Sequence, residues 1–146
     1  MNLRDKFENG SILSEDYVLP TIIRLGIIRQ IPIFLFLNMS SVQFLSKFIP
    51  IYAQIDKDKI KDGDLGPEEW QHLDRKIVGL CDAPIYLQDL EIKSIEDYKS
   101  AEEVIINEKV KYVFIDSLPE AIDKSKIIKW SEEVGFNVYF TNFTLK

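Results

Sequence analysis

Three polar side chains that can hold a metal ion, a water molecule or a phosphate group each come at the end of an apolar run. They are Asn38, Asp116 and Asn142. A carboxylate is a ligand that Mg²⁺ accepts, and carboxamides both donate and accept hydrogen bonds. Because open α/β sheets bind ligands at the carboxyl ends of their parallel strands, we expect the three side chains to line one crevice. Each could instead simply end a strand or start a loop, and this alternative stays open.

The run that carries Asp116 is the clearest strand in the chain. Five of the seven residues from Val110 to Asp116 are β-branched or aromatic, the types that fit a pleated surface. From Tyr112 to Ile115 the run is apolar without alternation, which is typical of a strand covered on both faces. We therefore predict a central buried strand at residues 110–115 with Asp116 at its carboxyl end.

Strand-like and helix-like segments alternate over nearly the whole chain. This order predicts right-handed crossovers and a three-layer α/β architecture, with a mainly parallel sheet flanked by helices, in one domain that spans residues 1–146. The expected strands are residues 31–37, 84–87, 110–115 and 137–143, with residues 11–13 as a further short candidate. The expected helices are residues 16–29, a helix after Ser40, a helix from Pro67, and residues 94–106 and 122–134.

Local signals indicate where several of these helices begin. Ser40 and Gln43 have the spacing of a capping box, in which two side chains satisfy free backbone N–H groups. Pro67 suits the first position of a helix, and Pro20 is expected in the first turn of its own helix, where a missing N–H costs least. The helix from Pro67 is expected to bury a stripe formed by Trp70, Leu73, Ile77 and Leu80.

The composition is that of an acidic globular protein. A formal net charge of −6 argues against a broad basic surface for duplex DNA. With Cys81 as the single cysteine, no internal disulfide can form, which suits a reducing compartment. The residues after Met1 are polar, and the most apolar region, residues 21–39, is interrupted by Arg24 and Arg29. We therefore expect a cytoplasmic protein, away from membranes, with weak or absent nucleic-acid binding.

Five short stretches occur in an order that is characteristic of one family. They are Ile33–Ser40, residues 60–73, Ile85–Asp89, Val113–Leu118 and Val138–Phe143. In that order they resemble the strand ending in SLEMS, the R-x-G-x-L…EW…L segment, the hYIDD strand, the Walker B strand and the VIALSQL strand of the DnaB-type replicative DNA helicase ATPase domain. The resemblance implies a RecA-like fold of the P-loop NTPase kind. It also makes Asp116 the counterpart of the Walker B carboxylate, and so a candidate ligand for Mg²⁺.

The chain departs from this family where the phosphates of ATP would bind. A P-loop has the pattern G-x-x-x-x-G-K-[ST], in which backbone N–H groups and a lysine surround phosphate. By the resemblance it would lie at residues 8–16, which read Glu-Asn-Gly-Ser-Ile-Leu-Ser-Glu-Asp. No glycine in the chain is followed by lysine, and the segment carries three acids where phosphate would need positive charge.

Two further departures concern the candidate catalytic residues. Asn38 stands where the family has a glutamate that serves as the candidate base for activating water, and an amide cannot accept that proton at neutral pH. Asn142 stands where the family has a glutamine near the γ-phosphate, and its side chain is one methylene shorter. Asp116 is thus the one clear survivor of the ATPase set, and phosphoryl transfer needs several groups acting together.

These residues lead us to expect a non-catalytic relative of the helicase ATPase core. It would act through a protein partner or self-association linked to DNA replication or recombination, with no cofactor. A second hypothesis is an ATP-binding and ATP-hydrolysing helicase domain with a non-standard phosphate loop, which would use MgATP. A third is a regulatory module that binds a small ligand in the crevice near Asn38, Asp116 and Asn142.

Overall fold

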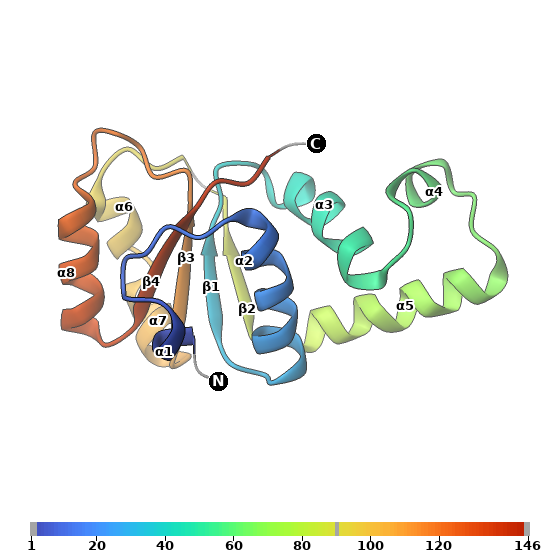
Figure 1. Cartoon of the computed structure of the whole chain (residues 1–146), viewed down its shortest axis with the longest axis horizontal. Coiled ribbons are helices and arrows are strands. Elements are labelled where there is room, and N and C mark those ends of the chain that lie inside the picture. The colour runs from blue at the N-terminus through green and yellow to red at the C-terminus, as the bar shows by residue number, and fades with distance from the viewer. Residues whose placement is uncertain (1–2, 90, 145–146) are drawn as a thin grey trace.

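Four parallel strands form the centre of the computed structural model, which describes residues 3–89 and 91–144 (Figure 1). The strands are β1 (Ile33–Phe36), β2 (Ile85–Gln88), β3 (Tyr112–Asp116) and β4 (Asn137–Thr141), and their order across the sheet is β2-β1-β3-β4. The predicted central strand at residues 110–115 is therefore an interior strand, and every residue of β3 is buried. All pairings among these four strands are parallel, as the alternation of elements predicts.

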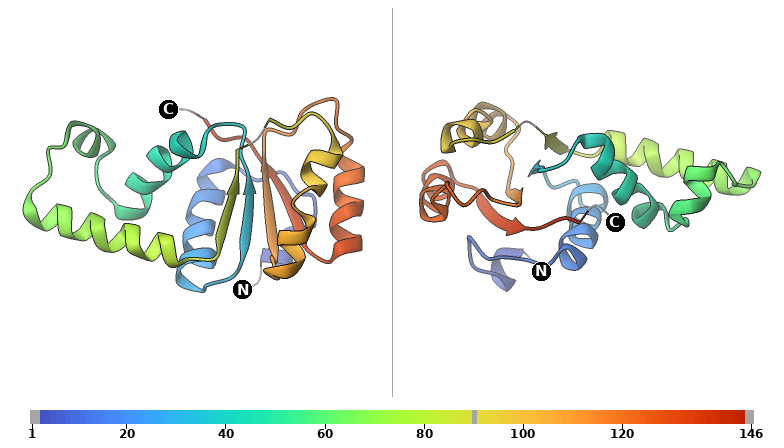
Figure 2. Two further views of the ribbon diagram at one scale, coloured as in Figure 1. Left: turned by 180° about the vertical axis from the view of Figure 1, so that it is seen from behind. Right: turned by 90° about the horizontal axis from the view of Figure 1, so that it is seen from above.

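Helices cover both faces of the sheet, which gives the expected three layers (Figure 2). One face packs on α1 (Leu3–Lys6), α2 (Glu15–Ile22) and α3 (Ser41–Ala53), and its core contains Leu35, Phe114 and Tyr139. The other face packs on α6 (Ile95–Lys99), α7 (Glu102–Asn107) and α8 (Lys124–Val134), and its core contains Val113 and Trp130. The alternating side chains of one strand thus serve two separate cores.

Helices α4 (Lys57–Asp62) and α5 (Pro67–Asp82) form an arm that extends from the end of α3 beyond the sheet, on the right in Figure 1. The capping box at Ser40 is present, with both side chain to backbone bonds made at 3.0 Å. Helix α5 begins at Pro67 as predicted, but its predicted buried stripe is wrong in part. Leu73 is buried, whereas Trp70 is 43% exposed and Ile77 36% exposed. These two residues are not covered because α5 extends beyond the sheet.

Three other expectations need correction. Pro20 lies within α2 rather than in its first turn, and α2 continues as a π-helix from Ile23 to Ile28. The expected strand at residues 11–13 is a single bridge between Ile12 and Phe140. The expected helix over residues 94–106 is broken between α6 and α7. Each segment lies at the predicted place along the chain, and the differences concern how regular it is.

Within the described part of the chain, every helix is too short or too polar to cross a membrane.

Candidate site at the carboxyl edge of the sheet

Asp116 and Asn38 lie next to each other at the carboxyl edge of the sheet, as the sequence predicts. Asp116 is the last residue of β3, and Asn38 follows β1, the neighbouring strand. In this contact the backbone N–H of Asn38 donates to the carboxylate of Asp116. Asn38 itself is an exposed residue. Asn142, which directly follows β4, is also exposed. The strand ends therefore converge, but the two carboxamides do not join Asp116 in a buried set of side chains.

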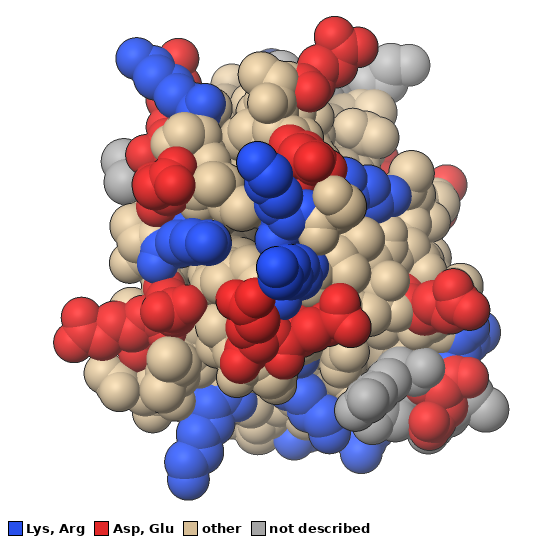
Figure 3. Space-filling view, turned by 90° about the vertical axis from the view of Figure 1, so that its left-hand side faces the viewer, with Lys and Arg blue, Asp and Glu red and all other residues tan. Residues whose placement is uncertain are grey.

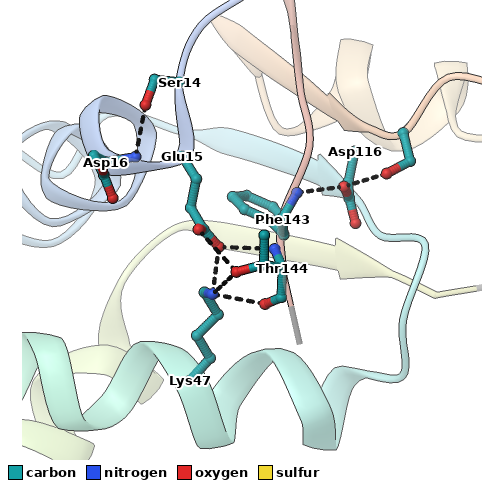
Figure 4. A network of polar contacts seen from close by, with 8 residues as sticks. Ser14, Glu15, Asp16, Lys47, Asp116, Phe143 and Thr144 are labelled. Atoms are coloured by element: carbon teal, nitrogen blue, oxygen red, sulfur yellow. Dashed lines mark hydrogen bonds and ion pairs between the residues drawn. The ribbon is translucent and has the colours of Figure 1, made fainter. Parts of the chain in front are cut away.

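The carboxylate of Asp116 is buried and accepts three hydrogen bonds from the protein. Its Oδ2 accepts from the backbone N–H of Asn38 (3.0 Å), and its Oδ1 accepts from the Ser117 hydroxyl (2.8 Å) and from the backbone N–H of Phe143 (2.9 Å). Asp116 is 4% exposed. A carboxylate offers about four lone-pair positions, so about one is left for an external ligand. The side chain thus joins the segments that follow β1 and β4, and Figure 4 shows its bond to Phe143.

Metal binding at Asp116 would need further ligands. Among the described residues, no group of three or more His, Cys, Asp or Glu side chains is arranged to hold a metal ion. Mg²⁺ keeps several waters and is often bound through one or two carboxylates together with substrate phosphates. The residues present would therefore fit Mg²⁺ only if phosphate groups were held beside Asp116.

The segment expected to hold those phosphates uses its backbone N–H groups elsewhere. Gly10 donates to the carbonyl of Val138 and Leu13 donates to the carbonyl of Phe140, both at 2.7 Å. Ser11 donates to the carbonyl of Glu8 at 3.1 Å. The bonds of Gly10 and Leu13 attach the segment to the edge of β4. A phosphate cradle needs such N–H groups to point together at the ligand, so the segment is built as part of the sheet edge.

Gly10 is required in that segment for two reasons. Its φ angle is +88°, in the region that glycine adopts easily. A Cβ at this position would also lie 2.5 Å from Cδ1 of Ile128 on α8. The glycine therefore permits close packing against a helix of the domain.

The first turn of α2 carries a carboxylate that bonds to distant parts of the chain. Glu15, the first residue of α2, accepts from the backbone N–H of Thr144 (3.0 Å) and from its hydroxyl (3.2 Å). It also pairs with Lys47 of α3, whose Nζ donates to the carbonyl oxygen of Thr144 (2.6 Å). Figure 4 shows Glu15, Lys47 and Thr144 pointing toward one another. We call Glu15, Lys47, Asp116, Phe143 and Thr144 the crevice network.

The charged side chains of the crevice network are largely shielded from water, whereas Thr144 is exposed. The side chains of Lys47 and Glu15 are only 12% and 16% exposed, and the ring of Phe143 packs on Phe44 of α3, with 5.4 Å between centroids. Burial opposes the charged form of Glu15. The hydrogen bonds and charge of Lys47, together with Thr144, outweigh it and lower the pKa of the Glu15 carboxyl. Glu15 is thus held as a carboxylate at the end of a helix that attracts anions.

A small cavity of about 190 Å³ lies on the other side of Asp116. Its lining includes Asn38, Glu91, Tyr98 and Ser117 as well as Asp116. Burial, then the charge of Asp116 and that of Asp97, raise the pKa of Tyr98 to about 12, so its hydroxyl stays neutral and can donate. The cavity is smaller than the usual 300–1,000 Å³ of a ligand site, and a nucleotide would not fit it.

Sequence reasoning missed most of the crevice network. Glu15 had one signal, its place directly after the helix-capping residue Ser14, whose Oγ accepts from Asp16 N. Lys47 and Thr144 gave none, since they meet Glu15 only when α3 and the segment after β4 pack on α2. The predicted position of Asp116 at the carboxyl end of the central strand is confirmed. Its use to bind backbone N–H groups was not predicted.

Comparison with known proteins places the chain in a family. The model of the DnaB-like helicase C-terminal domain matches residues 21–134, most of the chain. The chain belongs to this family. The match begins after residues 8–16, the segment where a phosphate loop was expected and was not found. No curated protein matches the chain.

Two solved structures have the same fold as this DnaB-like domain. A DnaB-like replicative helicase, described with its interactions with primase, superposes with a TM-score of 0.69 at 15% identity. This match covers 92% of the chain and 39% of the helicase chain. A second structure, described as an ATPase domain, superposes with a TM-score of 0.72 at 17% identity. This match covers 86% of the present chain and 51% of the other protein's chain. The domain thus spans about half or less of these relatives, and the likeness concerns the fold.

Proposed function

We propose that this DnaB-like domain is non-catalytic and acts through protein–protein contacts linked to DNA replication or recombination. The observation that carries the proposal is the crevice network. Two carboxylates at the expected nucleotide site, Glu15 and Asp116, both accept hydrogen bonds from the segment after β4. A triphosphate would have to displace that segment and overcome the negative charge of both side chains.

The charge distribution supports contacts with protein rather than with nucleic acid. The net charge is −6. On the face that carries α6 and α8, shown in Figure 3, basic and acidic side chains are interspersed without a continuous basic area. Binding to a phosphate backbone needs clustered Lys and Arg. One structural relative is described by its interactions with primase, so protein contacts are a precedent within the fold.

Calorimetry with MgATP tests the non-catalytic part of the proposal. We expect no heat of binding in the micromolar range, because the backbone N–H groups of Gly10, Ser11 and Leu13 bond within the domain instead of surrounding a phosphate position. Titration of MgCl₂ alone is the control. A dissociation constant near micromolar, or ATP turnover that single-stranded DNA stimulates and Asp116→Ala abolishes, would support an active ATPase with a non-standard phosphate loop instead.

The cavity beside Asp116 favours one second candidate, a regulatory module for a small ligand. The neutral hydroxyl of Tyr98 and the carboxylates of Asp116 and Glu91 would suit a compact molecule that carries a donor or a positive charge. This candidate predicts that a screen of small amines and metabolites contains a compound that raises the melting temperature of the wild type but not of Tyr98→Phe. If no compound does so, the candidate is rejected.

A further inference from the structure

Two cavities meet at the turn between α8 and β4, at the amino edge of the sheet. Their volumes are about 310 and 540 Å³, and Gly135 and Phe136 line both of them. The turn between α7 and β3 lies next to this one, because β3 and β4 pair from their first residues, Tyr112 and Asn137. Figure 1 shows both turns at the lower edge of the sheet, away from the crevice network. We call the two cavities, which are lined by residues 8–9, 105–111 and 131–137, the amino-edge groove.

One half of the amino-edge groove is apolar and basic. Its apolar lining consists of Ile105, Ile106, Val110, Val134 and Phe136. Its charged lining residues are Lys109 and Lys111, both exposed, in a chain whose net charge is −6. Within the described part of the chain, neither lysine is in an ion pair. The ammonium group of Lys111 lies 5.9 Å from the centroid of the Tyr112 ring, a contact that helps to keep it at this edge. This half therefore suits a bulky apolar side chain with acidic neighbours.

The other half of the groove is polar and acidic. Its charged lining residues are Glu8 and Glu132, both exposed. Asn9 fixes the shape of this half, because its Nδ2 donates to the hydroxyl of Ser131 (2.9 Å) and its Oδ1 accepts from the backbone N–H of Val138 (2.7 Å). These bonds hold the N-terminal segment against α8 and β4. The acidic half is thus a built wall of the domain, and it suits basic side chains of a ligand.

Two residues with left-handed backbone conformations shape the groove. Gly135 follows α8 with a φ angle of +102°, and a Cβ built on it would meet no atom within 4 Å. The floor that the two cavities share is therefore open. Lys109 has a φ angle of +54° in the turn after α7, where glycine would be the easier residue. A lysine in this conformation costs stability, so its side chain rather than the turn explains its presence.

We propose that the amino-edge groove binds a short peptide segment of another protein, with a bulky apolar side chain among acidic residues at one end and basic residues at the other. Charge complementarity selects this occupant. Lys109 and Lys111 attract its acidic end, and Glu8 and Glu132 attract its basic end. A nucleic acid, which is negative along its whole length, would be repelled by the acidic half. The inference rests on the proposed function, because it names the site and the partner chemistry of a protein-binding domain.

The first arm of the test uses a fluorescein-labelled peptide of about twelve residues, in which aspartates surround one phenylalanine and lysines follow. We expect saturable binding by anisotropy, which Lys111→Glu weakens about tenfold and raised salt weakens further. Lys126→Glu, at an exposed residue of α8, is the matched control for net charge and should bind like wild type. Glu8→Lys with Glu132→Lys should weaken binding of this peptide and strengthen binding of one whose lysines are replaced by aspartates.

The second arm fills the floor of the groove. Asparagine tolerates the left-handed conformation, so Gly135→Asn should keep the turn, place a side chain over the shared floor and weaken binding about tenfold. Gly63→Asn is the matched control, because Gly63 also ends a helix with a positive φ angle, +69°, and open space around it. This control should bind like wild type. Circular dichroism of each variant establishes that the fold is retained.

The third arm separates a binding role of Lys109 from a structural one. Lys109→Gly should raise the urea midpoint, because it relieves the left-handed backbone, and should weaken peptide binding about fivefold. A fall in the urea midpoint with unchanged binding would contradict the proposal. It would assign Lys109 to the negative end of the α7 dipole instead.

Three further outcomes overturn the proposal. The peptide fails to bind at about millimolar concentration, it binds Lys111→Glu and Gly135→Asn as well as wild type, or a single-stranded oligonucleotide displaces it at a lower concentration than the unlabelled peptide does. The last result would assign the groove to nucleic acid. Each of these outcomes leaves the MgATP titration untouched, so the partner and the loss of catalysis are judged separately.

Discussion

Replacing Asp116 with alanine is expected to lower the free energy of unfolding by about 3–4 kcal/mol, measured by urea denaturation. The substitution leaves the backbone N–H groups of Asn38 and Phe143 without their buried acceptor. Each unsatisfied buried donor costs about 1–3 kcal/mol, more where the lost partner is charged. Asp62→Ala, at an exposed residue of the arm, is the control and should change stability by less than about 0.5 kcal/mol.

The same experiment separates a structural carboxylate from a metal ligand. Asp116→Asn keeps the shape but turns one oxygen into a donor, which then faces an N–H group, so we expect it to be destabilised by about 2 kcal/mol. Millimolar Mg²⁺ should leave the urea midpoint of the wild type unchanged. If Asp116→Asn is as stable as the wild type, and Mg²⁺ stabilises the wild type, Asp116 binds a metal ion rather than backbone N–H groups.

Breaking the pair between Glu15 and Lys47 is expected to cost about 2 kcal/mol in either single variant, Glu15→Gln or Lys47→Met. Each change leaves the other group largely buried and removes bonds to Thr144. In the double variant the loss should be smaller than the sum of the two by about 1 kcal/mol, since the interaction is removed only once. The exposed pair Lys59 and Glu69 is the matched control, in which the same cycle should show no measurable coupling.

Acid should remove the contribution of Glu15 in a predictable window. Its pKa in the folded state is lowered from the ordinary value of 4.5. The stabilisation is therefore complete above the pKa of the unfolded chain, and it is lost as the pH falls through the lower pKa of the folded state. Urea midpoints measured across pH 3–6 should fall more steeply below about pH 4.5 for wild type than for Glu15→Gln. Parallel curves would contradict this assignment.

The parts of the fold that local signals control were predictable from the sequence. The hydroxyl of Ser40 accepts from the backbone N–H of Gln43, and the Gln43 side chain accepts from that of Ser40, so the capping box needs no knowledge of the rest of the fold. The apolar run before Asp116 similarly predicts a strand buried on both faces, because no other environment suits it. Trp70 shows the limit of this reasoning. A helical stripe predicts which residues share a face, but it cannot tell whether another element covers that face.

The candidate site was predictable only in its position. Parallel topology brings the ends of β1, β3 and β4 together, and this follows from the order of the elements. The contacts of Asp116 do not follow from it, since two of its donors are backbone groups of Asn38 and Phe143 that the sequence pattern does not mark. Lys47 likewise reaches Thr144 across 97 positions of sequence. Contacts of this range depend on how the helices pack, which residue types alone do not specify.

The bond between Glu15 and Thr144 can form only late in folding. These residues are 129 positions apart, and the bridge between Ile12 and Phe140 spans a similar distance. Closing a loop of this length carries a large entropic cost, which only the nearly complete sheet can offset. During synthesis, Glu15 at the start of α2 therefore lacks this partner until the segment after β4 has been made. We expect α4 and α5, which pack on the nearby helix α3, to become structured before the sheet closes around Asp116.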